Sequence, residues 1–590
     1  MSSSQQPDTA SAPGPSTSSG RAPKGKACLS CRRRKMRCDC TRPVCGQCVR
    51  FNRERDCEYT DGDQRSRTEI LEEKIATLQA RIRTLEGSMS SSSSLPLTSF
   101  PHSSASYSRG SPLPLSAHDT GSGNSSPNSH MSQHTESSPA FSDLLVETFL
   151  AYADDLGFFL DVTRFLNHVS FLYSTPGGSS QDPLLATVHL WGAVLQSNEQ
   201  LCAHEAGFLS NAVGQLSNIW SSQTYCPIRI IQAEILLANY YFYSGRLVEG
   251  RAHLGSAVSI ALTYRLHKIR STNSYFVKNL NLVPASATLP PPVDQIEEGE
   301  RLYAFWTVYV MDKSWAVALD CESTLVEDGS PATRIEAPWP LASQMFQTGS
   351  VPDDYRGSRT IQRFLNEPLA HSIPGVLSTA ALRAQATALL DRAKWLSSTC
   401  TADPSLVVIH EGAFTRLDGL IEDFILSLPP LDMLRIHSPA QTRSLVTTHM
   451  VARLAIIQLH IGFSDSDVAS AIKCLSASKA IIAAFKVLCP GQAEPPQNDF
   501  LYLEPFVQVL LTASAKIMLL EQEKFKQNRA LWQSMAVSSS AVYMRSALYE
   551  LLDQMRKVNP RSPFTSMQVA KLDHYRQSLG DIALFTTYSS

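Results

Sequence analysis

Apolar residues recur at three- and four-residue spacing through most of residues 141–590. This spacing places apolar side chains on one face of a helix, and no sustained two-residue alternation typical of strands interrupts it. The clearest helical segments are 228–243, 247–266, 301–319 and 444–462. The pattern therefore predicts an all-α body of about 450 residues.

Local signals at the helix ends agree with this prediction. Asp182 precedes Pro183 and an apolar run, which predicts a helix with Asp as its N-cap and Pro as its first residue. Ser244-Gly245 separates two apolar segments, so we expect two antiparallel helices joined at the glycine. Small residues on one side of the second helix would let this pair approach closely: Ala252, Gly255, Ala257 and Ala261.

The chain before residue 141 has a different composition. Residues 1–20 are polar and small, and residues 88–140 are rich in Ser, Pro, Gly and His. Neither segment can bury enough apolar surface to fold, so we predict a disordered tail and a disordered linker. Between them lie a basic, cysteine-rich block at 21–60 and a charged amphipathic helix at 67–87.

The helix at 67–87 has the pattern of a short coiled coil. Leucines recur every seven residues with isoleucines between them, a combination that favours a parallel two-stranded coil. With fewer than three heptads, the same pattern also fits an amphipathic helix packed on the C-terminal body. We predict a homodimer that uses this helix through Leu71, Ile75, Leu78, Ile82 and Leu85.

Length and composition limit the class of protein. A chain of 590 residues predicts two or more domains, and 43% apolar residues can form a large core. The N-terminus has no apolar stretch typical of a signal peptide, and the best candidate for a membrane span, 507–520, is interrupted by Lys516. We therefore expect an intracellular protein without a membrane segment. In that setting, clustered cysteines indicate metal rather than disulfides.

The net charge of -2 conceals a strong asymmetry. Residues 21–57 carry twelve Lys or Arg against three acidic residues, which makes this segment +9 and the rest of the chain -11. A compact segment this basic is the electrostatic footprint of a polyanion-binding module, and nucleic acid is the usual polyanion. A solvated charged face or a nuclear-targeting tract is the alternative interpretation.

Six cysteines in the basic block follow the spacing C-x2-C-x6-C-x6-C-x2-C-x8-C. Each C-x2-C pair can place two thiolates on one ion in a tight turn. Six thiolates are too many for one tetrahedral ion and two short of the eight that two separate ions need. Two zinc ions can each be four-coordinate if two sulfurs bridge them. We predict a site for two zinc ions made by Cys28, Cys31, Cys38, Cys45, Cys48 and Cys57.

The block resembles the fungal binuclear zinc-cluster family of transcription regulators. The resemblance rests on residues 28–39, on Pro43-Val-Cys45-Gly-Gln-Cys48 and on Cys57. It implies that Cys28 and Cys45 are the bridging ligands and that Pro43 turns the loop between the two halves. A seventh cysteine, Cys40, departs from the usual pattern, and we interpret it as a free thiol.

The same resemblance implies that a short helix from Cys31 carries its basic C-terminal end into the DNA major groove. Lys35 matches the family's base-reading lysine, and a lysine can donate to guanine O6 and N7. Arginines around it are better suited to phosphates, which position a module without specifying sequence. Family members commonly recognise CGG-type half-sites. The predicted DNA-binding residues are Lys35, Arg32, Arg33, Arg34, Arg37 and Arg42.

Three stretches of the body resemble the fungal-specific regulatory domain that accompanies such clusters. They are residues 243–267, residues 299–313 around Trp306, and Pro338-Trp339-Pro340. We interpret the tryptophans and tyrosines here as helical core residues rather than as a ligand site. Asp312 and Lys313 are adjacent, and we interpret them as an ion pair with each other.

Enzyme signatures are missing from the body. We find no G-x-S-x-G elbow, phosphate-binding glycine loop, H-E-x-x-H or dinucleotide fingerprint. The isolated histidines His189, His253 and His267 are interpreted as packed or exposed helix residues. The sequence therefore predicts a nuclear, zinc-dependent regulator of RNA polymerase II genes, homodimeric on double-stranded DNA, with possible transcriptional co-regulators. An interaction or sensor protein, with DNA binding secondary, is the alternative.

Overall fold

The structure is a computed structural model, and it divides into two compact units, Met1–Gly123 and Asn124–Ser590. The predicted tail at 1–20 and coiled-coil helix at 67–87 lie outside the described residues, as does the predicted linker up to residue 138. The structure describes residues 27–51, 57, 59, 139–175, 181–196, 204–219, 225–272, 289–327, 329–367, 378–403, 405–489, 502–527 and 535–578.

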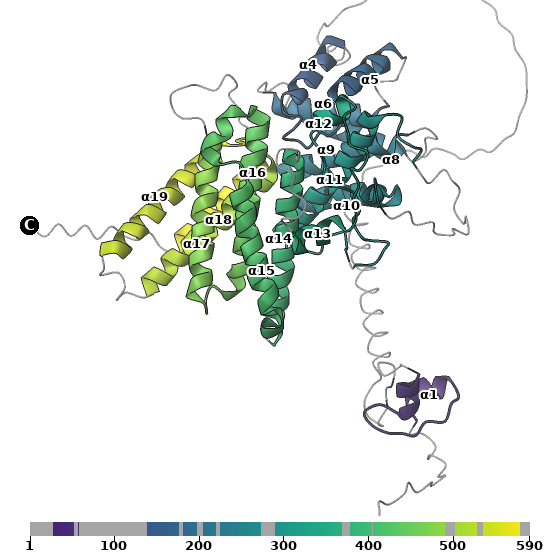
Figure 1. The fold of residues 1–590 in the computed structure, drawn as a ribbon, viewed down its shortest axis with the longest axis vertical. Helices are drawn as coiled ribbons and strands as arrows, with labels where there is room; N and C mark the ends of the chain where they lie inside the picture. Colours follow the sequence, from purple (N-terminus) through teal and green to yellow (C-terminus); the bar gives the residue numbers. More distant parts are fainter. Residues whose placement is uncertain are drawn as a thin grey trace, which may run out of the picture. The chain divides into compact units, whose positions relative to one another are not determined.

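The fold class is all-α, as predicted: the described residues contain helices and one isolated bridge, Ser271 to Gly357. The first unit holds two short helices, α1 (Leu29–Arg33) and α2 (Gly46–Arg50). The second unit holds the longer helices (Figure 1). Their bounds are α4 Pro139–Leu150, α5 Val162–Ser174, α6 Pro183–Leu195, α8 Glu205–Asn218, α9 Pro227–Tyr243, α10 Leu247–Thr263, α11 Gln295–Ala318, α12 Ser343–Gln347, α13 Thr360–Asn366, α14 Thr379–Ala402, α15 Leu406–Ser427, α16 Pro439–His460, α17 Val468–Leu488, α18 Pro505–Gln527, α19 Met535–Lys557 and α20 Pro563–Ser578.

Two of the predicted helix-end signals are confirmed. The Asp182 side chain accepts a hydrogen bond from the Leu185 amide at 2.8 Å, and Pro183 is the first residue of α6. Gly245 ends the turn between the antiparallel helices α9 and α10 with a φ of +74°. An L-residue with a Cβ rarely adopts this backbone conformation, so glycine permits the tight reversal.

The predicted close approach of α9 and α10 is correct in part. Ala257 and Ala261 are buried between the helices, but Ala252 is exposed and Gly255 faces open space. The tightest approach is at Gly250, where an added Cβ would lie 2.6 Å from ring carbons of Phe242. Gly250 was not among the small residues predicted to permit the close approach. The presence of small residues does not by itself show which face of the helix is buried.

Two predicted helix starts are wrong by several residues. α11 begins at Gln295 rather than at Arg301, with Asp294 as an N-cap that accepts from the Glu297 amide at 2.9 Å. α16 begins at Pro439 rather than at 444, after a capping box between Ser438 and Gln441. Both first turns are polar. Apolar periodicity cannot detect such turns. The capping residues that precede them are the sequence signal for where these helices begin.

The second unit contains two hydrophobic cores. One lies among α4 to α11, around Trp191, Trp306 and Phe242, and the other lies among α14 to α20, around Phe485 and Leu511. Figure 1 shows the corresponding two groups of helices, the first in blue and teal and the second in green and yellow.

Ion pairs cross the boundary between the two cores. Arg443 on α16 bonds both carboxylate oxygens of Asp155, at 2.8 and 2.9 Å from Nε. Lys313 on α11 pairs with Asp391 on α14 at 3.1 Å. Charge-assisted bonds of this kind have defined geometry, so they fix how the two groups of helices pack against each other.

The aromatic residues of α11 are core residues, as we interpreted them. Trp306 and Tyr309 are each 1% exposed. The Trp306 Nε1 donates to the Pro338 carbonyl at 2.8 Å, and its ring stacks on Trp339 with 4.5 Å between centroids. The proline-flanked tryptophan therefore closes over α11 as part of the core.

The interpretation of Asp312 and Lys313 as an ion pair with each other is wrong. Asp312 is fully buried and pairs with Arg251 at 3.0 Å, while it also accepts from the Leu325 amide at 2.9 Å. Lys313 instead pairs with Asp391 on α14 at 3.1 Å. Consecutive residues of a helix point about 100° apart, so each side chain reaches a different neighbour.

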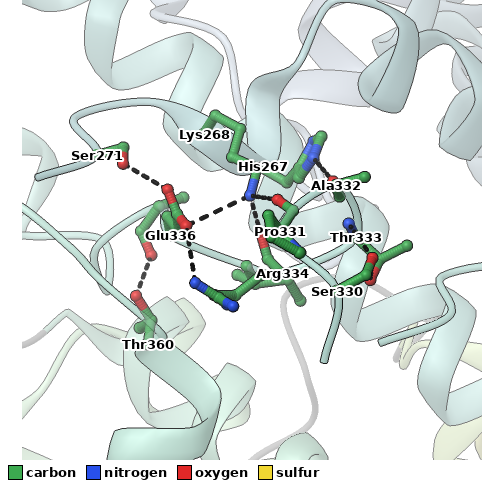
Figure 2. Close-up of polar contacts among 12 residues, drawn as sticks. His267, Lys268, Ser271, Ser330, Pro331, Ala332, Thr333, Arg334, Glu336 and Thr360 are labelled. Carbon is green, nitrogen blue, oxygen red and sulfur yellow. Dashed lines mark hydrogen bonds and ion pairs between the residues drawn. The ribbon is translucent and has the colours of Figure 1, made fainter. Parts of the chain in front are cut away.

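Two of the three histidines make hydrogen bonds with other parts of the body, and the third, His189, lies partly buried on α6. Burial lowers the pKa of His189 to about 4, and His253 bonds Glu234 at 2.6 Å. His267 donates from Nε2 to the Ala332 carbonyl at 3.0 Å. Figure 2 shows the adjoining network, in which the buried Glu336 accepts from Ser271 at 2.5 Å and faces the Lys268 ammonium at 3.5 Å. This network fastens the loop after α11 to the end of the α9–α10 pair.

Within the part of the chain that the structure describes, two helical segments are long and apolar enough to cross a membrane by length and composition, Pro439–Phe463 and Val468–Leu488. Neither is the candidate chosen from the sequence, 507–520. The apolar window of the first is 72% buried inside the protein and that of the second 44%. Both contribute side chains to the second core.

Candidate metal centre and nucleic-acid interface

Two cysteines of the first unit begin its two helices. Cys28 precedes α1 and its Sγ accepts from the Cys31 amide at 3.4 Å. Cys45 precedes α2 and its Sγ accepts from the Cys48 amide, also at 3.4 Å. Each C-x2-C pair thus occupies a first helical turn, which turns both sulfurs of the pair to the same side. The cluster therefore contains the same arrangement twice, a C-x2-C pair whose first cysteine caps a short helix.

The sulfurs of these four cysteines lie at distances suited to zinc. The Sγ atoms of Cys28 and Cys45 are 3.7 Å apart, those of Cys28 and Cys48 are 3.8 Å apart, and those of Cys31 and Cys45 are 3.6 Å apart. Four sulfurs at about 2.3 Å from a tetrahedral zinc lie about 3.8 Å from one another. The three sulfur separations are close to this value, so the spacing of these cysteines is compatible with zinc ligation.

The remaining two predicted ligands lie in the same cluster. The side chains of Cys38, Asp39 and Cys45 form a second group whose ligand atoms are within 4.8 Å of one another, and Cys45 belongs to both groups. The Cys57 Sγ accepts from the Cys45 amide at 3.2 Å. All six predicted cysteines are thus brought together, and a sulfur shared between two groups is what a bridged pair of ions needs.

Burial and hydrogen bonding act differently on these thiols. Burial raises the pKa of Cys28 and raises the pKa of Cys31 to about 12. Burial acts in the same direction on Cys45, but hydrogen bonds from the Cys48 amide and from neighbouring thiols outweigh it and lower the pKa of Cys45 to about 6. The thiolate is the form that binds metal, and the hydrogen bonds at Cys45 favour that form.

The seventh cysteine stands apart from the sulfur groups found among the described residues. Cys40 is partly exposed, has a φ of +59° and contacts the Cys38 carbonyl from Sγ at 3.8 Å. These observations support its interpretation as a free thiol.

Asp39 is a structural residue that the sequence analysis did not single out. Its carboxylate accepts from the Gly46 amide at 2.9 and 3.1 Å, at the start of α2. Burial would raise the pKa of Asp39, but the bonds from Gly46 and Thr41 lower it. A Cβ at Gly46 would lie 2.5 Å from the Asp39 Oδ2, so a larger residue here would displace the carboxylate from this position. The carboxylate joins the two halves of the cluster.

The predicted DNA-binding residues lie on the surface of the cluster. All six are exposed, and three of them (Arg32, Arg33 and Arg34) occupy the last turn of α1 and its C-cap. Lys35 follows with a φ of +56°, and its amide donates to the Arg32 carbonyl at 3.2 Å while the Met36 amide donates to the Cys31 carbonyl at 3.0 Å. This left-handed residue ends the helix sharply, as in a Schellman motif. A continuous cationic edge results.

Tyr59 is a second residue that the sequence analysis missed. It lies two residues after the last predicted ligand, Cys57, and packs on the cluster. Its hydroxyl donates to the Thr41 carbonyl at 2.9 Å, and the Arg42 guanidinium lies over its ring, 4.9 Å from the centroid. An aromatic residue within a polar segment was the available signal.

Comparisons with known proteins find a family match within each unit. Residues 26–66 match the Fungal Zn(2)-Cys(6) binuclear cluster domain, and residues 148–355 match the Fungal specific transcription factor domain. The resemblance drawn from the sequence is thereby confirmed: the chain carries the two domains of a fungal zinc-cluster transcription regulator. The cluster domain binds two zinc ions. Residues 356–590, which contain the second core, lie beyond both matches.

One relative matches a short stretch of the chain. The chromatin structure-remodeling complex protein RSC30 of Saccharomyces cerevisiae is 51% identical over 39 residues, which make up 7% of this chain and 4% of that protein. The chain therefore matches a small fraction of this relative's length. No solved structure matches the chain.

Proposed function

We propose that this chain is a sequence-specific, DNA-binding transcription factor that regulates RNA polymerase II genes in the nucleus. The observation that carries the proposal is the exposed cationic edge from Arg32 to Arg37 on a cysteine cluster whose sulfur spacing fits zinc. A rigid, strongly basic edge of this size fits the phosphate-lined major groove.

The roles within the cluster follow from position. We assign Cys28 and Cys45 as the bridging ligands, supported by their 3.7 Å separation and by the place of Cys45 in both ligand groups. Cys31, Cys38, Cys48 and Cys57 complete the two tetrahedra. When bound, zinc holds the two halves of the cluster together and so supplies the folding energy of a unit with almost no apolar core.

The roles on the surface divide between bases and phosphates. Lys35 stands where α1 ends, so its ammonium extends beyond the helix toward base edges and donates to guanine. Arg32, Arg33, Arg34, Arg37 and Arg42 pair with backbone phosphates. The preferred sequence contains CGG-type half-sites.

The protein acts as a homodimer through the coiled-coil helix at 67–87. Leu71, Leu78 and Leu85 at d with Ile75 and Ile82 at a support this arrangement. A helix packed on the body would leave the protein monomeric on a single half-site. The body is a non-enzymatic regulatory domain, on which transcriptional co-regulators act.

Selection of bound sites from random duplex DNA by the full-length, zinc-loaded chain tests this proposal. We expect enrichment of a CGG-type triplet present twice at a fixed spacing. Recovery of no sequence above the input pool would overturn specific DNA binding, and recovery of isolated triplets would overturn the dimer.

A further inference from the structure

One arginine in the body is stacked on an aromatic ring but has no carboxylate partner. Arginines lie over aromatic rings at four places in the described part of the body. At three of these places the arginine also pairs with a carboxylate: Arg246 with Glu249, Arg270 with Glu298 and Arg576 with Asp573. The fourth is Arg392, whose Cζ lies 4.1 Å from the centroid of the Trp395 ring. Its guanidinium makes no hydrogen bond or ion pair with the described residues.

The guanidinium of Arg392 has also lost part of its hydration. The residue is partly buried on α14, and burial lowers its pKa against a weaker opposite effect of Asp391. The Asp391 carboxylate itself pairs with Lys313 at 3.1 Å. A carboxylate brought to Arg392 from outside would accept parallel hydrogen bonds from the guanidinium and so offset the lost hydration.

Trp395 gives the same place an exposed apolar surface. It is 46% exposed and is the only exposed tryptophan among the described residues. The His410 ring on α15 stands nearly perpendicular to it, 6.0 Å between centroids, where the two helices of the α14–α15 hairpin meet (Figure 1). Val408 and Ile409, next to His410 in the chain, are 79% and 71% exposed. Tryptophan and arginine are enriched among the residues that dominate the affinity of protein interfaces.

We propose that Arg392 and Trp395 form a docking site for an acidic, apolar peptide segment of a transcriptional co-regulator. A large apolar side chain of the segment covers the Trp395 ring, and a neighbouring Asp or Glu supplies the carboxylate that Arg392 lacks. The inference rests on the regulatory role proposed for the body and names the chemistry of one partner. The chain outside residues 21–57 carries a net charge of -11, which disfavours a polyanion such as nucleic acid here.

The test begins with a random peptide library displayed on phage, from which the full-length, zinc-loaded chain selects binders. We expect the enriched peptides to share an Asp or Glu beside a large apolar side chain. Enrichment of peptides without this pair, or no enrichment above a blank surface, would overturn the proposal. Displacement of the selected peptide by single-stranded oligonucleotides would show that the surface takes nucleic acid instead, and would also overturn it.

A fluorescein-labelled copy of the most enriched peptide then gives affinities by fluorescence anisotropy. Arg392→Ala and Trp395→Ala should each weaken binding about 10-fold or more, as for residues at the centre of an interface. Arg246→Ala is the matched control, because it removes an arginine that is stacked on Tyr241 but already has a carboxylate partner. This control should bind the peptide as the wild type does. Equal losses from Arg392→Ala and Arg246→Ala would contradict a specific site.

A change in the peptide makes the test independent of how each variant folds. Replacement of the peptide's carboxylate by the matching amide should weaken binding to the wild type about 10-fold. The same replacement should have no further effect on binding to Arg392→Ala. A loss that persists in that background would show that the carboxylate does not reach Arg392, which overturns the proposal. If selection of sites from random DNA fails while these peptide results hold, the proposed function is overturned and the docking site is not.

Discussion

The cysteine cluster and the helical body of this protein are held together by different forces. The described part of the cluster buries little besides cysteine side chains, whereas the body buries two apolar cores built from more than ten helices. Metal ligation is directional and depends on a few sulfurs, while apolar burial is non-directional and spread over many side chains. The two regions should therefore fail under different perturbations.

Removal of zinc should give the largest difference between the regions. Structural zinc contributes about 10–16 kcal/mol per ion in small metal-folded peptides, far more than a unit of this size gains from burial. A chelator, or Cys45→Ala, should abolish DNA binding by the full-length chain and leave the helical circular dichroism of the body largely intact. Cys40→Ser is the control and should bind zinc and DNA as the wild type does. Loss of the body's helical signal on chelation would contradict the separation.

The body should respond instead to loss of a buried charge. Asp312→Ala leaves the Arg251 guanidinium without its carboxylate, and breaking a buried pair in this way costs about 3–5 kcal/mol. Urea unfolding followed by circular dichroism should show this loss, with zinc content unchanged. The exposed pair between Lys557 and Asp553 gives the comparison, since Asp553→Ala should cost about 0.5 kcal/mol or less. Equal losses would show that the Asp312 network does not hold the fold.

The proposed dimer helix should affect DNA binding without affecting either region's fold. Replacement of Leu78 and Ile82 by glutamate removes the second binding event, and linked binding of two modules commonly adds about 100-fold or more in affinity. We expect a loss of this size on a probe with two half-sites and little change on a probe with one. Equal losses on both probes would support a helix packed on the body.

The two regions also differ in how much of them the sequence could predict. The ligand spacing alone placed six cysteines in one cluster, because few arrangements satisfy tetrahedral zinc with six thiolates. Apolar periodicity found four helices of the body, α9, α10, α11 and α16, and capping found the start of α6. The partners of Asp312 and Lys313, in contrast, lie 61 and 78 residues away in sequence. Tyr59 and Asp39 were missed for the same reason. Their roles depend on contacts across the cluster, which no local pattern contains.

The account's central claim is that the cationic edge of the cluster reads sequence through Lys35 and binds phosphates through its arginines. The most direct measurement compares Lys35→Ala with Arg42→Ala on cognate and scrambled duplexes at several salt concentrations. Lys35→Ala should cost about 1–3 kcal/mol on the cognate site and flatten the discrimination between the two duplexes. Arg42→Ala should weaken both duplexes alike and lower the salt slope by about one unit. If Lys35→Ala instead lowers affinity equally on both duplexes, Lys35 contacts phosphate, and the proposed readout of sequence is contradicted.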